Sequence, residues 1–210
     1  MLDFDKDIST VFETYHQRIE TENALMASLP IEEGMQRRDE FLLPVGEEVG
    51  TFMYQMVKAS KAQTILEVGT SYGYSTLWLA CAAKEIGAKV ITFEIDNEKA
   101  NYAIDQLVKA GLANVVDFRV GDAVERIKAA PEMFDFVLVD IWKELYVPAF
   151  NVLYPKLNPG AYLVGDNMTF PPSNKKEATE YRNAIRATQA FDSVLLPIGS
   201  GIEVSQLLEK

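Results

Sequence analysis

The chain has 210 residues, and its 31 acidic against 20 basic residues give a net charge of −11, the wrong sign for non-specific nucleic-acid binding. The length suits one domain with a two-sided core. No run of about 20 apolar residues predicts a membrane helix, the acidic N-terminus is unlike a secretory signal, and the lone Cys81 lies in an apolar helical stretch typical of a core thiol. We therefore expect a cytoplasmic protein.

The first predicted element is an amphipathic helix, with apolar positions at Ile8, Val11, Phe12, Tyr15 and Ile19. Pro30 and Gly34 are expected to interrupt it, and a second helix is predicted from about Gly46 to Ala59. Residues 1–40 hold ten acids and four bases. We interpret this excess as a solvated helical face rather than an acidic docking surface.

Five short β-branched runs follow, "TILEVG", "KVITFEI", "VVDFRVG", "FDFVLVD" and "AYLVGDN". Helix-like stretches lie between them at 75–87, 96–110, 122–130 and 144–157. This alternation predicts an α/β fold with a parallel sheet covered by helices on both faces. At the end, "FDSVLLPI" and "GIEVSQLL" are joined by Gly199-Ser200-Gly201, which predicts a hairpin at the edge of the sheet.

The first strand runs into a glycine turn, "ILEVGTSYGYST". Gly69 and Gly73 let the backbone approach a ligand beyond the carboxyl end of the strand. The E-x-G-x-x-x-G spacing differs from the G-x-G-x-x-G of dinucleotide binders. It suits a nucleoside cofactor that has no pyrophosphate and whose amino-acid end meets the Glu67 carboxylate.

Acidic residues also end the next two strands. Glu94 follows Gly73 by 21 residues, where a carboxylate can accept hydrogen bonds from both ribose hydroxyls; the alternative is a solvent-exposed strand-end Glu. Asp122, in "VGDAVERI", can face an adenine amino group or cap the following helix.

A metal site is constrained by composition. With one His and one Cys, the chain cannot build an imidazole-rich or thiolate site. Any metal would be held by oxygens, which favours Mg²⁺ and leaves Ca²⁺ and Mn²⁺ open.

With these motifs in order, the chain resembles the class I S-adenosylmethionine-dependent methyltransferases, and more narrowly the metal-dependent catechol and caffeoyl-CoA type O-methyltransferases and their small bacterial relatives. The likeness runs from about Val45 to Leu208 and includes "LPVGEEVG", "LVDIWKELY", "LVGDN" and "PIGSGIEVS". It implies a Rossmann-like, seven-stranded, mostly parallel sheet with a reversed last strand. It also implies one methyltransferase domain over 1–210, with an N-terminal helical segment at 1–44 and a cofactor-binding core at 45–210.

The same resemblance implies roles for individual residues. The S-adenosylmethionine site would be lined by Val45, Glu67, Gly69, Ser75, Glu94, Asp122 and Asp140. The metal ligands would be Asp140, Asp166 and Asn167, and the base would be Lys143. The chain departs from the catechol enzymes at Ile141, where they have His, and at Pro171-Pro172 in the following loop. Glu180 is matched only loosely to an acid that contacts their substrate.

The chemistry gives these residues a reason. Adjacent parallel strands ending at Asp140 and at Asp166-Asn167 would bring three oxygen ligands together at one sheet edge. Lys143 follows Asp140 by three residues, on the same side of a helical turn. Burial and a nearby cation would free its amine to take a proton; the alternative is an ordinary ion pair with Asp140. Trp142 would either line the site beside the methyl group or an aromatic substrate ring, or be a buried ring that only packs the loop.

We therefore expect a Mg²⁺-dependent O-methyltransferase that acts on a hydroxyl of a small, catechol-like acceptor and that forms a homodimer. Methylation of a hydroxylated tRNA nucleoside is an alternative that the acidic charge disfavours. A nicotinamide-dependent dehydrogenase would need a pyrophosphate-binding turn that "EVGTSYG" lacks. A non-enzymatic S-adenosylmethionine-binding module would have no reason to keep Asp140, Lys143, Asp166 and Asn167 together.

Overall fold

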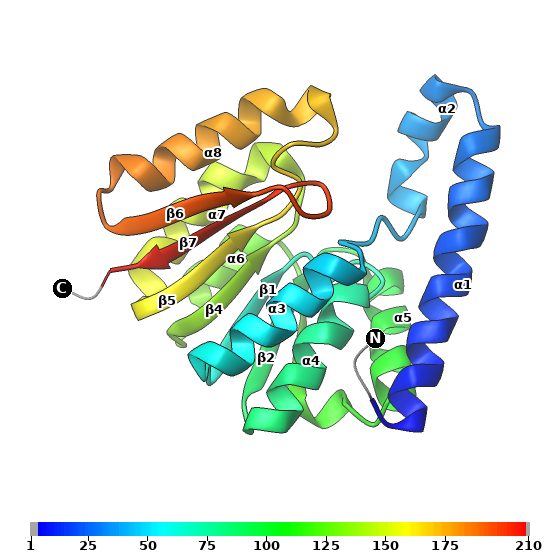
Figure 1. Cartoon of the computed structure of the whole chain (residues 1–210), viewed down its shortest axis with the longest axis horizontal. Coiled ribbons are helices and arrows are strands. Elements are labelled where there is room, and N and C mark those ends of the chain that lie inside the picture. The colour runs from blue at the N-terminus through cyan, green and yellow to red at the C-terminus, as the bar shows by residue number, and fades with distance from the viewer. Residues whose placement is uncertain (1–3, 209–210) are drawn as a thin grey trace.

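The computed structural model of the chain describes residues 4–208, and all seven predicted strands form in one sheet (Figure 1). The strands are β1 (Thr64–Val68), β2 (Lys89–Glu94), β3 (Val116–Val120), β4 (Phe134–Val139), β5 (Leu157–Gly165), β6 (Phe191–Leu196) and β7 (Ile202–Leu207). Their order is β3-β2-β1-β4-β5-β7-β6, and β7 runs antiparallel to both of its neighbours. The predicted fold class and the terminal hairpin are confirmed.

The helices are α1 (Lys6–Ser28), α2 (Ile31–Gln36), α3 (Glu47–Ser60), α4 (Tyr74–Ile86), α5 (Asn97–Lys109), α6 (Ala123–Ala129), α7 (Tyr146–Leu153) and α8 (Lys175–Ala187). Short 3₁₀ turns lie at Arg38–Glu40, Ala113–Val115, Lys143–Leu145, Tyr154–Lys156 and Pro172–Asn174. Four predicted helices agree to within a few residues. The interruption expected at Gly34 is wrong, because Pro30 ends α1 and α2 then continues through Gly34.

The sheet is covered on both faces, as Figure 1 shows. On one face α3 and α4 pack with part of α1 around Trp78 and Met53, and on the other α7 and α8 pack around Phe150 and Tyr181. Cys81 is buried in the first of these layers, as predicted, and burial raises the pKa of its thiol to about 12. Within residues 4–208, no helix combines the length and the apolar character needed to cross a membrane.

The N-terminal segment is anchored at its start and again near residue 40. The apolar face of α1, formed by Ile8, Val11, Phe12 and Tyr15, is buried against the chain's own core. The later part of α1 and α2 stand out as an arm beside the domain (Figure 1).

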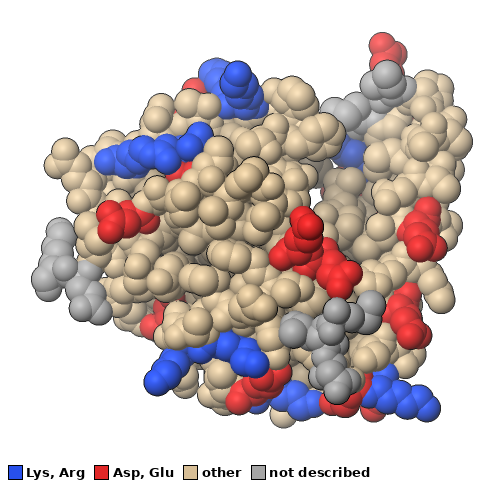
Figure 2. All heavy atoms as spheres, in the orientation of Figure 1, with Lys and Arg blue, Asp and Glu red and all other residues tan. Residues whose placement is uncertain are grey.

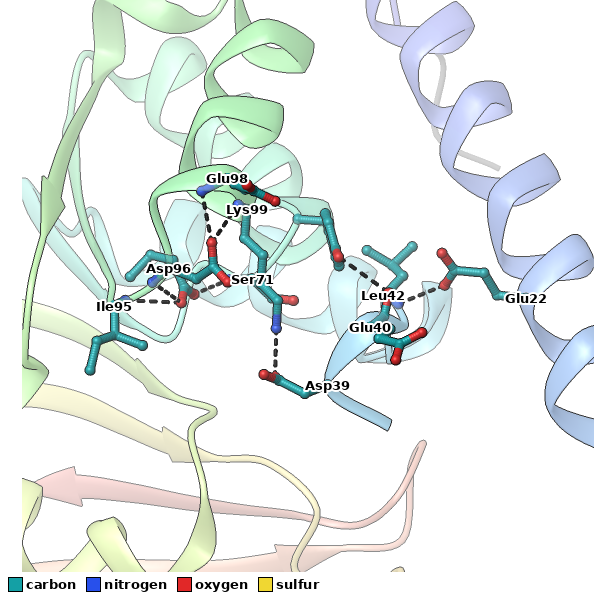
Figure 3. A network of polar contacts seen from close by, with 11 residues as sticks. Glu22, Asp39, Glu40, Leu42, Ser71, Ile95, Asp96, Glu98 and Lys99 are labelled. Carbon is teal, nitrogen blue, oxygen red and sulfur yellow. Dashed lines mark hydrogen bonds and ion pairs between the residues drawn. The ribbon is translucent and has the colours of Figure 1, made fainter. Parts of the chain in front are cut away.

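The chain returns from this arm through two polar contacts (Figure 3). The Leu42 N–H donates to the Glu22 carboxylate at 2.6 Å, and Lys99 Nζ lies 2.6 Å from the Asp39 carboxylate. These contacts hold the segment from Arg38 to Val45 to α1 and to the first turn of α5.

Candidate active site

A small, partly open hollow lies at the carboxyl ends of the central strands. It is lined by residues 42–45, 69–71 and 74–75 together with Asp140. Ligands of open α/β sheets bind at this edge. Four of the predicted cofactor residues, Val45, Gly69, Ser75 and Asp140, therefore line one hollow, although they come from three separate stretches of the sequence.

The turn after β1 needs glycine at its first position. Gly69 has φ +101°, and a Cβ atom added to it would lie 2.1 Å from the Asp140 carbonyl oxygen. The Gly69 N–H donates to the Phe93 carbonyl at 3.1 Å. The turn is therefore pressed between the ends of β2 and β4, where no side chain fits.

Glu67 does not face this hollow. Its exposed fraction is 0%, and its carboxylate accepts hydrogen bonds from the hydroxyls of Ser75, Thr76 and Thr92, each at 2.6 Å. Burial raises the pKa of Glu67 to about 7, while these hydrogen bonds oppose the shift. The contact of Glu67 with the amino-acid end of a cofactor stays a prediction. Glu67 supports the glycine turn from below, and Asp140 is the carboxylate that faces the hollow.

Glu94 ends β2 and is half-buried, unlike the freely exposed strand-end Glu of the alternative interpretation. Its carboxylate accepts from the backbone N–H groups of Ser71, Ile95 and Asp96, at 2.6, 2.9 and 3.0 Å. Because a carboxylate has about four acceptor positions, one remains for a ligand hydroxyl. These three backbone N–H groups fix the orientation of the Glu94 side chain. The contact of Glu94 with a ribose stays a prediction.

Asp122 is exposed and caps α6, since its side chain accepts from the Glu125 N–H at 3.0 Å. The helix-cap interpretation is confirmed, and the adenine contact stays a prediction. The strand order β3-β2-β1-β4-β5 sets Asp122, Glu94, Gly69, Asp140 and Asp166 along the sheet edge in that sequence.

The predicted metal ligands lie at the ends of two neighbouring strands. Val139 pairs with Gly165 in the β4–β5 register, so Asp140 and Asp166 follow at the same level. Asp166 is 1% exposed, and its Oδ1 atom is buried without a hydrogen-bond partner. Burial, and next the Asp140 carboxylate, raise the pKa of Asp166 to about 8. Burial also raises the pKa of Asp140, which the Lys143 ammonium opposes.

Lys143 lies at this site and not in bulk solvent. It is 6% exposed, and its Nζ atom donates to the Tyr146 hydroxyl at 2.5 Å, to Asn167 Oδ1 at 3.2 Å and to the Ile141 carbonyl at 3.4 Å. Burial lowers the pKa of Lys143, while Asp140 and Asp166 oppose that shift. The amine is therefore held beside a predicted metal ligand in surroundings that disfavour its charged form.

Tyr146 was not predicted from the sequence. It is fully buried, accepts the hydrogen bond from Lys143, and can donate to the carbonyls of Val139 at 2.8 Å or Asp166 at 3.2 Å. Burial raises the pKa of its hydroxyl well above the ordinary value. The only sequence signal is its i+3 spacing from Lys143, which marks no function by itself.

The donor set suits a hard cation. Among residues 4–208, no three His, Cys, Asp or Glu side chains gather as a metal cluster, so a metal would need the Asn167 amide oxygen besides the two carboxylates. Asn167 has φ +52°, a left-handed conformation that Asn adopts more readily than most residues. The unpartnered Asp166 oxygen and two mutually repelling carboxylates are features that a divalent cation would relieve.

Trp142, between Ile141 and Lys143, is 39% exposed, so it is not a buried ring that only packs the loop. The Arg38 guanidinium lies over its ring, 4.3 Å from the centroid. Glu180 is exposed on α8, 3.9 Å from Lys176, and a substrate contact there stays a prediction.

Comparison with known proteins gives a consistent result. A family model described as O-methyltransferase matches residues 18–207. The catechol O-methyltransferase of Niastella koreensis is 32% identical over 130 residues, which cover 60% of this chain and 58% of that protein. The caffeoyl-CoA O-methyltransferase of Eucalyptus gunnii is 26% identical over 188 residues, which cover 80% of this chain and 75% of that protein.

Solved structures share the fold. An O-methyltransferase of tomaymycin synthesis from Streptomyces achromogenes, in complex with SAM, superposes with a TM-score of 0.77 at 22% identity, covering 100% of this chain and 92% of that one. An O-methyltransferase from Bacillus cereus, in complex with SAH, has a TM-score of 0.74 at 24% identity, covering 99% and 93%.

Proposed function

The chain belongs to the O-methyltransferase family, and on this premise we propose that it transfers a methyl group from S-adenosylmethionine to a hydroxyl of a small, catechol-like acceptor with the help of a divalent cation, most simply Mg²⁺. The observation that carries the proposal is the order of side chains along one sheet edge. Polar groups suited to a nucleoside, an amino-acid end and a metal follow each other on adjacent strands. The relatives named for catechol and caffeoyl-CoA methylation support the acceptor class.

Each part of the edge has a task in this proposal. The Asp122 and Glu94 carboxylates would bind the adenosine end, and the Gly69 turn with Ser75 and Val45 would enclose the methionine end. Asp140, Asp166 and Asn167 would hold the cation. When bound, the cation supplies a Lewis acid that stabilises the deprotonated oxygen, and S-adenosylmethionine supplies the methyl group.

Lys143 would accept the proton of the acceptor hydroxyl at Nζ. A free phenol has a pKa of about 10 and is mostly protonated at neutral pH, so a neutral amine at the reacting oxygen is needed. The hydrogen bonds of Nζ to Tyr146 and Asn167 fix where the amine lies. The deprotonated oxygen would then be placed to attack the methyl carbon of S-adenosylmethionine in line, with a C–O bond formed, the C–S bond broken and the thioether as the leaving group.

The test is a methylation assay. The protein is incubated with S-adenosylmethionine and catechol, with Mg²⁺ or with a chelator, and products are read by mass spectrometry. We expect methylated catechol only with Mg²⁺. Calorimetry with S-adenosylmethionine against NAD provides a second readout. Binding of NAD alone would overturn the proposal, and full activity in chelator would remove the metal from it.

Two further expectations stay proposals. The homodimer is one, and the apolar face of α1 is buried within the chain itself, so this face is not available for a dimer contact. Light scattering measures the mass in solution directly. Location in the cytoplasm is the other.

A further inference from the structure

Arg38 differs from the other arginines in its surroundings. Carboxylates form ion pairs with Arg18, Arg37, Arg119, Arg182 and Arg186. Arg126 has no carboxylate partner among the described residues, but it is exposed and donates to the Val120 carbonyl. Among the described residues, no such pair and no hydrogen bond engages the Arg38 side chain. Its two acidic neighbours are already occupied, because Asp39 pairs with Lys99 and Glu40 pairs with Arg37. A half-buried guanidinium without a carboxylate is unexpected in the most acidic part of a chain with net charge −11.

The position of Arg38 is fixed by an aromatic ring. Its guanidinium lies 4.3 Å from the centroid of Trp142, and the backbone around it is held by the Asp39–Lys99 and Glu22–Leu42 contacts (Figure 3). A guanidinium stacked on an indole keeps its N–H donors in the plane of the group, pointing outward. The N–H donors of Arg38 form no hydrogen bond with the described residues, so they are available to a carboxylate, which a guanidinium can bind in a bidentate pair.

Trp142 also places this group next to the proposed chemistry. It directly precedes Lys143 and lies two residues after Asp140, which lines the hollow. Leu43 lies in the same segment as Arg38, between residues 38 and 45. It is 47% exposed and lines the hollow together with Asp140. Figure 2 shows basic atoms within the opening between the N-terminal arm and the body of the domain. An acceptor entering here passes exposed apolar surface and one unpaired cation.

We propose that Arg38, stacked on Trp142, binds a carboxylate carried by the methyl acceptor, so that the preferred substrates are hydroxylated aromatic acids rather than neutral catechols. This inference rests on the proposed function. The hydroxyl to be methylated lies at Lys143 Nζ, the ring extends along Trp142, and the carboxylate on the far side of the ring reaches the guanidinium. Arg38 acts as a specificity-determining residue and takes no part in the proton transfer.

The test compares each acid with its own neutral ester. The acceptors are 3,4-dihydroxybenzoate, 3,4-dihydroxycinnamate, their methyl esters and the coenzyme A thioester of 3,4-dihydroxycinnamate, assayed with S-adenosylmethionine and Mg²⁺. For at least one pair we expect wild type to prefer the acid by about tenfold in kcat/KM, the size expected of one charge-assisted bidentate contact. Arg38→Gln should raise the KM for that acid about tenfold, with kcat and the ester kinetics unchanged.

Arg37→Gln is the matched control. It removes the same charge from the neighbouring position, and Arg37 is already paired with Glu33 and Glu40. It should keep the preference for the acid. Calorimetry of the acid with the protein, Mg²⁺ and S-adenosylhomocysteine gives a readout without turnover, in which Arg38→Gln should weaken binding by the same factor. Thermal melting confirms that the variants fold.

Three outcomes overturn the inference. One is an acid preference that survives Arg38→Gln, and another is the absence of any preference in a protein that methylates the esters; both leave the proposed function intact. The third is an Arg38-dependent preference for the coenzyme A thioester of 3,4-dihydroxycinnamate over the free acid, which would assign the guanidinium to phosphate. If wild type methylates none of these acceptors, the proposed function itself fails and this inference fails with it.

Discussion

Glu67, beneath the turn after β1, and Asp166, at the end of β5, are both buried carboxylates with raised pKa values, yet their surroundings differ. Three hydroxyls donate to Glu67, whereas Asp166 keeps a buried oxygen with no partner. A buried carboxylate whose acceptors are filled from within the chain stabilises the fold around it. One with an unfilled acceptor, beside a second carboxylate and an amine, is arranged for something that the chain itself does not supply.

Replacing Asp166 should give the largest effect on activity. Asp166→Asn keeps the shape of the side chain but removes one anionic oxygen ligand, so methyl transfer with Mg²⁺ should fall by about three orders of magnitude, equivalent to the several kcal/mol that a bound cation supplies. Thermal stability without metal should not decrease, because burial already disfavours the charged form of Asp166 and the neutral amide carries no such cost. Initial rates and melting curves measure the two effects, with the exposed Asp192→Asn as the control. A variant with near wild-type rates in Mg²⁺ would show that Asp166 holds no metal.

Replacing Lys143 tests whether the site around Asp166, where a carboxylate oxygen has no partner, is catalytic. Lys143→Met keeps a long side chain and removes the amine, and kcat at saturating acceptor and Mg²⁺ should fall by about 10²- to 10⁴-fold, the usual contribution of a general base. The KM for S-adenosylmethionine should stay the same. The exposed Lys175→Met serves as the control. Retention of wild-type turnover would show that Lys143 is not the base and only holds the loop through its contacts with Tyr146 and Asn167.

Replacing Glu67, whose carboxylate accepts three hydrogen bonds from within the chain, tests the pH dependence of stability. Its pKa rises from 4.5 to about 7 on folding, so between these values the folded state binds more protons than the unfolded state. The contribution of Glu67 to stability therefore falls as pH rises through this window, by about 3 kcal/mol in total. Glu67→Gln has no such ionisation. The unfolding free energy of the variant minus that of wild type should therefore increase as pH rises from 4.5 to about 7.

Urea unfolding from about pH 4.5 to pH 8 measures that difference, with the exposed Glu180→Gln as the control. Wild type and Glu67→Gln curves that stay parallel over the whole range would mean that Glu67 is ionised in the folded protein at a normal pKa, and the contrast with Asp166 would then weaken.

The sequence predicts which residues lie at the edge of the sheet far better than it predicts the tertiary contacts of their side chains. Strand ends follow from β-branched runs, and neighbouring parallel strands bring Asp140 and Asp166 to one level whatever the loops do. The burial of Glu67 was missed because its donors come from α4 and β2, and tertiary packing decides where those hydroxyls point. Arg38 and Trp142 lie about a hundred residues apart, so no local pattern announces their contact.

Tyr146 offers the smallest and most discriminating change. Its hydroxyl joins Lys143 Nζ to the ends of β4 and β5, so Tyr146→Phe removes one acceptor of the amine and one donor to a backbone carbonyl without changing the ring packing against Tyr181. We expect a loss of about 2 kcal/mol in unfolding free energy, the net value of two hydrogen bonds, and a fall in kcat of up to about tenfold as the amine loses its fixed position.

The KM values should not change, because Tyr146 is buried behind the amine and does not line the hollow. Tyr154→Phe, on the same side of the sheet and away from Lys143, gives the control for ring chemistry alone. Equal losses in kcat for both variants, or a rise in KM with kcat preserved, would mean that Tyr146 only packs. A fall in kcat confined to Tyr146→Phe would instead show that the geometry of the amine, and not its presence alone, sets the rate.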